Sequence, residues 1–235
     1  MPELDAAYWS NFWIERGQES VAADRQAQVL RTTNGKPIED ESFQPILDWV
    51  LLNLELCPTD DVLDLCCGNG IFSLPIAERC RSVYGVDVSF DFVSSIEASE
   101  RPNITTLASD IRNLDFPAER FDRVLLYAGI QYFSLSEAYC LIANIWNWLR
   151  PNGVLLLGDV PDLENRWAFF RTTEQRRNYF DSLAAGKPII GTWFQFDWLR
   201  FAGDSAGFSN CELLRQPEGF PYAHFRYDVR LRKSE

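Results

Sequence analysis

The chain has 235 residues, and its 34 acidic and 22 basic side chains give a formal net charge of −12 at pH 7. Hydrophobic residues make up 46% of the chain, a composition that excludes a disordered protein, a coiled coil and collagen. The acidic balance opposes binding to nucleic acid or to an anionic lipid surface, because both of these partners are negatively charged.

Residues 1–41 are predicted to form a helical extension ahead of the main domain. Tyr8 and Phe12, like Trp9 and Trp13, stand four residues apart, so their rings share one face of a helix. We expect this aromatic helix to form part of a lid that selects the substrate, with packing against an extra helical layer as the alternative.

The segment from about residue 61 alternates short apolar runs with amphipathic stretches. The apolar runs are typical of buried parallel strands and lie at 62–66, 83–86, 104–107, 124–127 and 154–157. Amphipathic helices are predicted at 42–56, 72–79, 90–99 and 135–149. Helical links between strands give a parallel sheet that is covered on both faces. We therefore predict one doubly wound α/β domain over residues 42–235.

The regular alternation ends after Asp159. Residues 161–205 are dense in aromatic side chains and are predicted to form an insert that covers the substrate, or else the core of an extra layer. Two further strands are predicted at 211–214 and 225–231, the second of which alternates strictly between apolar and polar positions.

A glycine loop at residues 62–70 gives the strongest chemical signal. A strand runs into this loop, and a helix follows at once. Gly68 and Gly70 let the backbone turn sharply and let a ligand lie against it without interference from a Cβ atom. Asp64 stands at the end of the strand, where a carboxylate can hold a cationic group of a ligand.

The same loop differs from that of a dinucleotide site. Such a site uses Gly-x-Gly-x-x-Gly, whereas Ser73 stands at the third glycine position counted from Gly68, and Cys66 stands where a glycine two residues before Gly68 would be. The carboxylate of Asp64 would also repel a pyrophosphate. The sequence therefore disfavours an NAD-type oxidoreductase, which remains an alternative with the same fold.

Two more acidic residues follow the next two strands at equal spacing. Asp87 comes 23 residues after Asp64, and Asp110 comes another 23 residues later. The carboxyl ends of parallel strands meet at one edge of a sheet, so these three acids are expected to face one crevice. Asp87 is placed to accept hydrogen bonds from a ribose diol. Each acid alone fits a helix N-cap or a turn equally well.

These residues resemble the class I S-adenosylmethionine-dependent methyltransferases. The motifs that carry the resemblance are the glycine loop, the acidic end of the second strand, two later strand ends and a turn, at 64–70, 86–87, 109–111, 121–124 and 149–154. The resemblance covers residues 42 to 160 well, and the two final strands look like the closing pair of the family. Cys66 departs from the commonest family pattern, which has glycine there, but a small residue is kept.

The resemblance implies a Rossmann-like, mostly parallel seven-stranded sheet with an antiparallel seventh strand, and S-adenosylmethionine as the cofactor. It also implies a cofactor-binding set that receives the methionine end (Asp64, Cys66, Cys67, Gly68, Gly70), the ribose (Asp87, Val88) and the adenine (Asp110, Ile111), with Tyr127 beside the sulfonium.

Three residues are candidates for the catalytic step. Asp159 follows the fifth strand at the active edge of the sheet and is a candidate base. His224 is the single histidine and another candidate base, with a surface or packing role as the alternative. Tyr132 follows the fourth strand and is expected beside the reacting atoms, again with simple packing as the alternative.

The cysteines and the lone histidine predict no metal site, because no Cys-x-x-Cys pair is present. No apolar run reaches the ~18 residues that span a bilayer, and the N-terminus lacks the layout of a signal peptide. We therefore expect reduced thiols in a cytoplasmic protein that makes no contact with membranes.

The sequence thus predicts an enzyme that transfers a methyl group to oxygen or nitrogen of a small molecule, for example in a biosynthetic pathway. It would act as a monomer or homodimer and would not bind nucleic acid. A non-catalytic module that binds an adenosyl ligand and a protein methyltransferase remain as alternatives.

Arg31 belongs to a set of basic residues that adds local positive charge to the acidic chain. Such a cluster either receives an anionic acceptor or forms an ordinary solvated surface.

Overall fold

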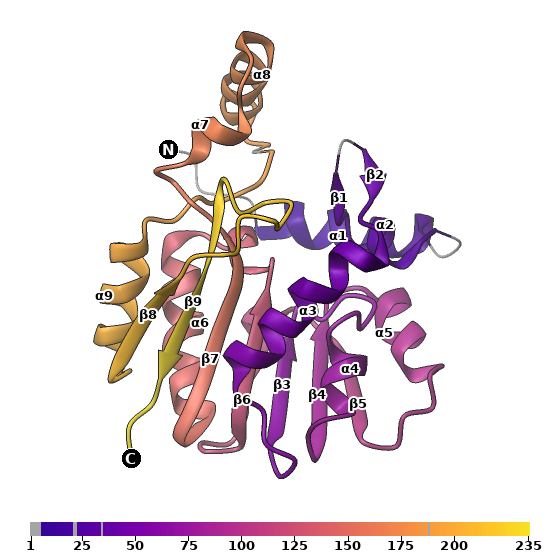
Figure 1. Cartoon of the computed structure of the whole chain (residues 1–235), viewed down its shortest axis with the longest axis vertical. Coiled ribbons are helices and arrows are strands. Elements are labelled where there is room, and N and C mark those ends of the chain that lie inside the picture. Colours follow the sequence, from indigo (N-terminus) through magenta and orange to yellow (C-terminus); the bar gives the residue numbers. More distant parts are fainter. Residues whose placement is uncertain (1–5, 21–22, 34, 188) are drawn as a thin grey trace.

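A central sheet organises the computed structural model, which describes residues 6–20, 23–33, 35–187 and 189–235 (Figure 1). Its strands are β3 (Asp61–Leu65), β4 (Ser82–Asp87), β5 (Ile104–Ala108), β6 (Phe121–Tyr127), β7 (Leu149–Pro161), β8 (Asn210–Leu214) and β9 (Arg226–Arg232). Their order is β5-β4-β3-β6-β7-β9-β8. The first five strands pair in parallel, whereas β9 runs antiparallel to both β7 and β8. The predicted doubly wound, mostly parallel seven-stranded sheet is confirmed.

Helices connect the strands and cover the sheet. They are α1 (Ala6–Glu19), α2 (Arg25–Gln28), α3 (Asp40–Leu54), α4 (Ser73–Ala77), α5 (Phe90–Glu97), η1 (Ile111–Asn113), η2 (Ile130–Tyr132), α6 (Leu135–Trp148), α7 (Arg166–Phe169), α8 (Thr173–Ala184) and α9 (Phe196–Ala206). A short hairpin of β1 (Thr32–Thr33) and β2 (Lys36–Pro37) precedes α3. None of these described helices is long and apolar enough to cross a membrane.

Two apolar layers hold the helices against the sheet. Leu63 and Leu65 point to the layer that contains α6 and α9, whereas Val62 points to the layer that contains α3 and α4. Each of these strand residues is fully buried, as alternation along a strand with two covered faces requires. Burial of apolar surface on both faces is the main source of stability for such a sheet.

The turn expected at 149–154 lies inside a strand. β7 begins at Leu149, and its pairing with β6 shifts register between Phe121 and Arg123. Asn152 has φ +63°, a left-handed conformation that asparagine tolerates. The chain therefore turns here through an irregularity within a continuous strand.

The aromatic segment 161–205 divides into two parts. α7 and α8 project beyond the carboxyl ends of the parallel strands (Figure 1), where Phe170, Tyr179, Trp193 and Phe225 form a small separate core. α9 instead contacts α6 and β8 and belongs to the layer that covers the sheet.

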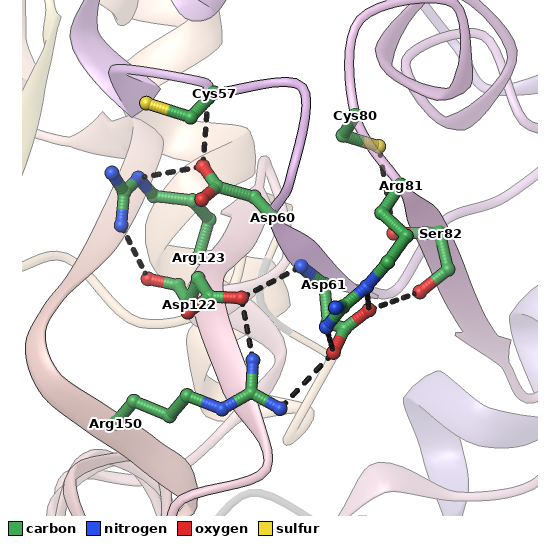
Figure 2. Close-up of polar contacts among 9 residues, drawn as sticks. All are labelled: Cys57, Asp60, Asp61, Cys80, Arg81, Ser82, Asp122, Arg123 and Arg150. Carbon is green, nitrogen blue, oxygen red and sulfur yellow. Dashed lines mark hydrogen bonds and ion pairs between the residues drawn. The ribbon is translucent and has the colours of Figure 1, made fainter.

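A cluster of ion pairs joins the amino ends of the parallel strands, at the end of the sheet away from α7 and α8 (Figure 2). Arg150 donates to the carboxylates of both Asp122 and Asp61, the latter at 3.0 Å. Asp122 also accepts the backbone N–H of Asp61 at 2.8 Å. A hydrogen bond from Arg81 holds the pKa of Asp61 far below its usual range. These contacts tie the amino ends of β3, β6 and β7 together.

Candidate active site

The glycine loop between β3 and α4 has no room for a side chain at its two glycine positions. Gly68 and Gly70 have φ +53° and +76°, in the left-handed region that favours glycine. A Cβ atom on Gly68 would lie 2.9 Å from the Val29 side chain, and one on Gly70 would lie 2.7 Å from Ile96. Any other residue at these two positions would therefore strain the backbone and displace a neighbouring side chain.

This loop forms one wall of a cavity at the carboxyl ends of β3, β4 and β5, which we call the first cavity. Asp64, Asp87 and Asp110 all line it, as expected from their equal spacing. Of the described residues predicted to bind the cofactor, only Gly70 lies outside its lining. The others in this lining are Cys66, Cys67, Gly68, Val88, Ile111 and Tyr127.

The two inner carboxyl groups are buried and hydrogen-bonded. Asp87 accepts the backbone N–H of Gly68 at 2.8 Å and that of Ser89 at 2.9 Å. Asp64 accepts the Ser73 hydroxyl. Burial raises the pKa of Asp64 to about 7 and that of Asp87 to about 6. A ligand with a cationic group and hydroxyl donors would stabilise both ionised forms, so these residues fit an adenosyl amino acid.

Asp110 lies at the rim of the first cavity in a more exposed position. Its carboxylate accepts from the Arg112 guanidinium at 2.9 Å and from the Ser10 hydroxyl of α1 at 3.0 Å. The next residue, Ile111, is buried and begins η1. Asp110 therefore already has partners on either side, and Arg112 is a neighbour that sequence reasoning missed.

Three non-glycine residues have positive φ at the carboxyl ends of the parallel strands. Cys66, Ala128 and Asp159 have φ +55°, +53° and +56°, next to or within β3, β6 and β7. Each lines a cavity. Backbone strain of this kind concentrates at functional sites, so its position supports an active site at this edge.

The thiols of the glycine loop are poor nucleophiles. Burial raises the pKa of Cys66 and Cys67 well above the usual value for a thiol. Both therefore stay protonated at physiological pH.

Helix α1 covers the first cavity with aromatic rings. Trp9 is 5% exposed, and its ring centroid lies 4.8 Å from that of Tyr132. Trp13 packs against the same ring at 5.5 Å. In Figure 1, α1 and α2 lie beyond the carboxyl ends of the parallel strands. The lid role expected of this extension stays a prediction, and its residues 1–5, 21–22 and 34 lie outside the described structure.

A second, larger cavity adjoins the first. The two share five lining residues at their junction: Trp9, Val29, Arg31, Ala128 and Tyr132. The second cavity continues toward β9 and the aromatic core of α7 and α8, where Phe169, Tyr222 and Phe225 line it. An acceptor held there would lie next to a ligand in the first cavity.

The candidate catalytic residues occupy different places. Asp159 is buried in the second cavity, where it pairs with Arg226 at 3.5 Å and accepts from Gln216 at 3.3 Å. Tyr132 lies at the junction, and burial raises the pKa of its hydroxyl. His224 is exposed, lies 2.7 Å from the Arg171 guanidinium and lines neither of these cavities.

Sequence reasoning missed two arginines that line the cavities, Arg31 and Arg226. Arg226 sits in an alternating strand, and nothing in that pattern distinguishes it from a surface residue. Arg31 was one of several scattered basic residues, yet it is 5% exposed and lines both cavities. Among the described residues, no group of His, Cys, Asp or Glu side chains could hold a metal ion.

Comparisons with known proteins relate part of the chain to methyltransferases. Residues 62–153 match a family model described as a methyltransferase domain. A 23S rRNA uracil-C5 methyltransferase of Photobacterium angustum is 35% identical over 107 residues, which cover 42% of this chain and 44% of that relative. A trans-aconitate 2-methyltransferase of Deinococcus radiodurans is 31% identical over 137 residues, which cover 57% and 50%. The chain thus matches about half the length of these curated relatives.

Among solved structures, magnesium protoporphyrin IX methyltransferase of Synechocystis with bound S-adenosylhomocysteine has a TM-score of 0.66. The match covers 98% of this chain and 100% of that chain, at 15% identity. The family model thus matches residues 62–153 of this chain, and the sheet shares the fold of a methyltransferase that was solved with S-adenosylhomocysteine, the product of S-adenosylmethionine.

Proposed function

We propose that this protein is an S-adenosylmethionine-dependent methyltransferase that methylates a small molecule on oxygen or nitrogen. The observation that carries the proposal is the gathering of Asp64, Asp87 and Asp110 in one cavity that adjoins a second one. When bound, the cofactor supplies an electrophilic methyl group on its sulfonium. The protein then has mainly to align the acceptor and exclude water.

The proposed cofactor roles follow the chemistry of each side chain. The carboxylate of Asp64 would attract the ammonium of the methionine end, and the loop backbone from Cys66 to Gly70 would lie along it. Asp87, with Val88 beside it, would accept from the ribose hydroxyls. Asp110 and the backbone N–H of Ile111 would contact adenine. The remaining member, Tyr127, would face the sulfonium with its ring.

The acceptor would need a base if its nucleophile is a hydroxyl. We assign this role to Asp159, since its carboxylate lines the second cavity and has Arg226 to balance its charge. Tyr132 would stay neutral and orient the acceptor by hydrogen bonding. Partial burial and the nearby Arg171 lower the pKa of His224. Because His224 is exposed and lines neither cavity described, it could serve as a base only for an acceptor that reaches the surface.

A small molecule suits the second cavity better than nucleic acid does. The rRNA methyltransferase relative makes RNA the main rival acceptor. A chain with net charge −12 repels a phosphate backbone, and Phe12, Ile190 and Phe225 give the cavity an apolar lining. A non-catalytic adenosyl-binding module and a protein methyltransferase are weaker candidates.

All six cysteines are free thiols, which supports a reducing cytoplasm as the compartment.

Calorimetric titration with S-adenosylhomocysteine and with NAD tests the proposal. We expect S-adenosylhomocysteine to bind, NAD not to bind, and Asp87→Ala to weaken binding at least about tenfold, because it removes a charge-assisted hydrogen bond. Asp181→Ala, at an exposed position on α8, is the matched control and should bind like the wild type. Binding of NAD in place of S-adenosylhomocysteine would overturn the proposal.

A further inference from the structure

Arg31 is a buried guanidinium at the junction of the two cavities. It stands just before β1, is 5% exposed and lines both cavities. The other basic residues with which the sequence grouped it include Lys36 and Arg171, which are exposed. Burial of a charged group without a paired charge is costly, so the surroundings of Arg31 call for an explanation.

Three aromatic rings lie within cation–π distance of this guanidinium. Its central carbon lies 5.1 Å from the ring centroid of Tyr127, 5.5 Å from that of Phe43 and 5.6 Å from that of Phe72. Cation–π contacts of this kind hold the charge in place. A polar partner of the guanidinium must bind at its nitrogen atoms, as the side chain of Tyr127 does.

One edge of the guanidinium lacks such a partner. Nε and Nη2 of Arg31 are both buried, and no hydrogen bond joins either atom to a described residue. These two nitrogens form the fork that binds both oxygens of one carboxylate. Asp159 is near enough to act on Arg31 electrostatically, but its ion pair is with Arg226 at 3.5 Å.

We propose that Arg31 is a carboxylate-binding residue, whose Nε and Nη2 receive the carboxylate of a ligand at the junction of the two cavities. The inference rests on the proposed function for the identity of that ligand. The carboxylate belongs either to the amino-acid end of the cofactor or to the acceptor. Because Arg31 lines both cavities, both sources reach the same fork.

Two sets of probes distinguish the sources. The first set is S-adenosylhomocysteine and 5′-methylthioadenosine, which lacks the amino-acid end. The second set consists of matched acids and amides, namely benzoate with benzamide, cinnamate with cinnamamide and octanoate with octanamide. Affinities are measured by calorimetry for the wild type, Arg31→Met and Arg31→Lys. The acids and amides are titrated both with and without saturating S-adenosylhomocysteine.

For Arg31→Met we expect a loss of at least about tenfold in one of two quantities, the affinity for S-adenosylhomocysteine or the ratio of acid to amide affinity. The reason is that a charge-assisted pair of hydrogen bonds is removed. Weaker binding of S-adenosylhomocysteine, with 5′-methylthioadenosine unchanged, assigns the carboxylate to the cofactor. Loss of the preference for acid over amide assigns it to the acceptor. In Arg31→Lys the charge stays but the fork is lost, so we expect an intermediate affinity.

The proposal is overturned if Arg31→Met and Arg31→Lys leave both comparisons at their wild-type values. Should Arg31→Met fail to fold, as judged by circular dichroism, Arg31→Lys alone decides by the same criterion. Arg200→Met removes an exposed charge on α9 and should change neither comparison. Failure of the wild type to bind either nucleoside would count against the proposed function, whereas the acid and amide arm would still test Arg31.

Discussion

Asp64 and Asp87 show how burial prepares two carboxyl groups for a ligand. Their raised pKa values, about 7 and about 6, mean that the folded protein binds these protons more tightly than the unfolded chain does. Their contribution to stability is therefore fully present below about pH 4 and is lost as the pH rises from there to about 6 to 7. A ligand that carries an ammonium and hydroxyl donors favours the ionised forms and so lowers the free energy needed to ionise both carboxyl groups.

The affinity for S-adenosylhomocysteine should therefore rise with pH between about 5 and 8. We expect a gain of up to about tenfold per pH unit for each carboxyl group that must ionise. Calorimetry across this range measures the profile. Asp64→Asn should shift the steep part of the profile toward lower pH, because only Asp87 then titrates.

Asp228→Asn is the control for this experiment. The carboxyl group of Asp228 is also buried, and its pKa is raised to about 6, but it does not line the two cavities described. Its substitution should leave the pH profile unchanged. A flat wild-type profile would show that neither Asp64 nor Asp87 changes its ionisation on binding.

At the scale of elements, the N-terminal extension is fixed onto the glycine loop. Asn69, within the loop, donates to the carbonyl of Arg25 at 2.9 Å and to the side chain of Gln28. The Arg25 guanidinium in turn donates to the Asn69 carbonyl at 2.8 Å. Helix α2 is thereby coupled to the loop, and α1 covers the first cavity beside it.

Truncation of a ring on α1 should open this cover. We expect Trp9→Ala to weaken binding of S-adenosylhomocysteine about tenfold, since large buried aromatics dominate such interfaces. Trp167→Ala is the matched control, because Trp167 lies half-exposed on α7 and lines neither cavity described. Calorimetry measures the affinity of each variant for S-adenosylhomocysteine. An affinity of Trp9→Ala within twofold of the wild type would show that α1 does not contact the ligand.

The elements of the sheet were predictable from the sequence, but the position of the extension was not. Runs such as 62–66 and 124–127 are apolar because both faces of their strands are buried, so local pattern is enough. Ser10 instead donates to Asp110, which lies 100 residues later in the chain. No periodicity reports such a contact. For the same reason no sequence pattern indicates that Arg31 is buried or that Arg226 pairs with Asp159.

At the scale of the whole molecule, the ion-pair cluster and the cavities lie at opposite ends of the sheet. The ion pairs of Figure 2 lie at the amino ends of the strands, and the cavities lie at the carboxyl ends. Arg150→Met removes the partner of both Asp61 and Asp122. We expect it to lower the free energy of unfolding by about 1–2 kcal/mol, because two half-buried carboxylates lose their shared cation.

Urea denaturation measures this loss, and calorimetry should find the affinity for S-adenosylhomocysteine unchanged. Arg101→Met is the control, since its pair with Glu78 is exposed and should contribute little. Equal stability of the two variants would contradict a structural role for the cluster.

A crystal structure with S-adenosylhomocysteine tests the central claim most directly. We expect the ribose against Asp87, the adenine between Asp110 and Ile111, and the sulfur facing the junction with the second cavity. Ligand density in the second cavity, with the first cavity left free, would contradict the assignment of the cofactor site and with it the proposed function.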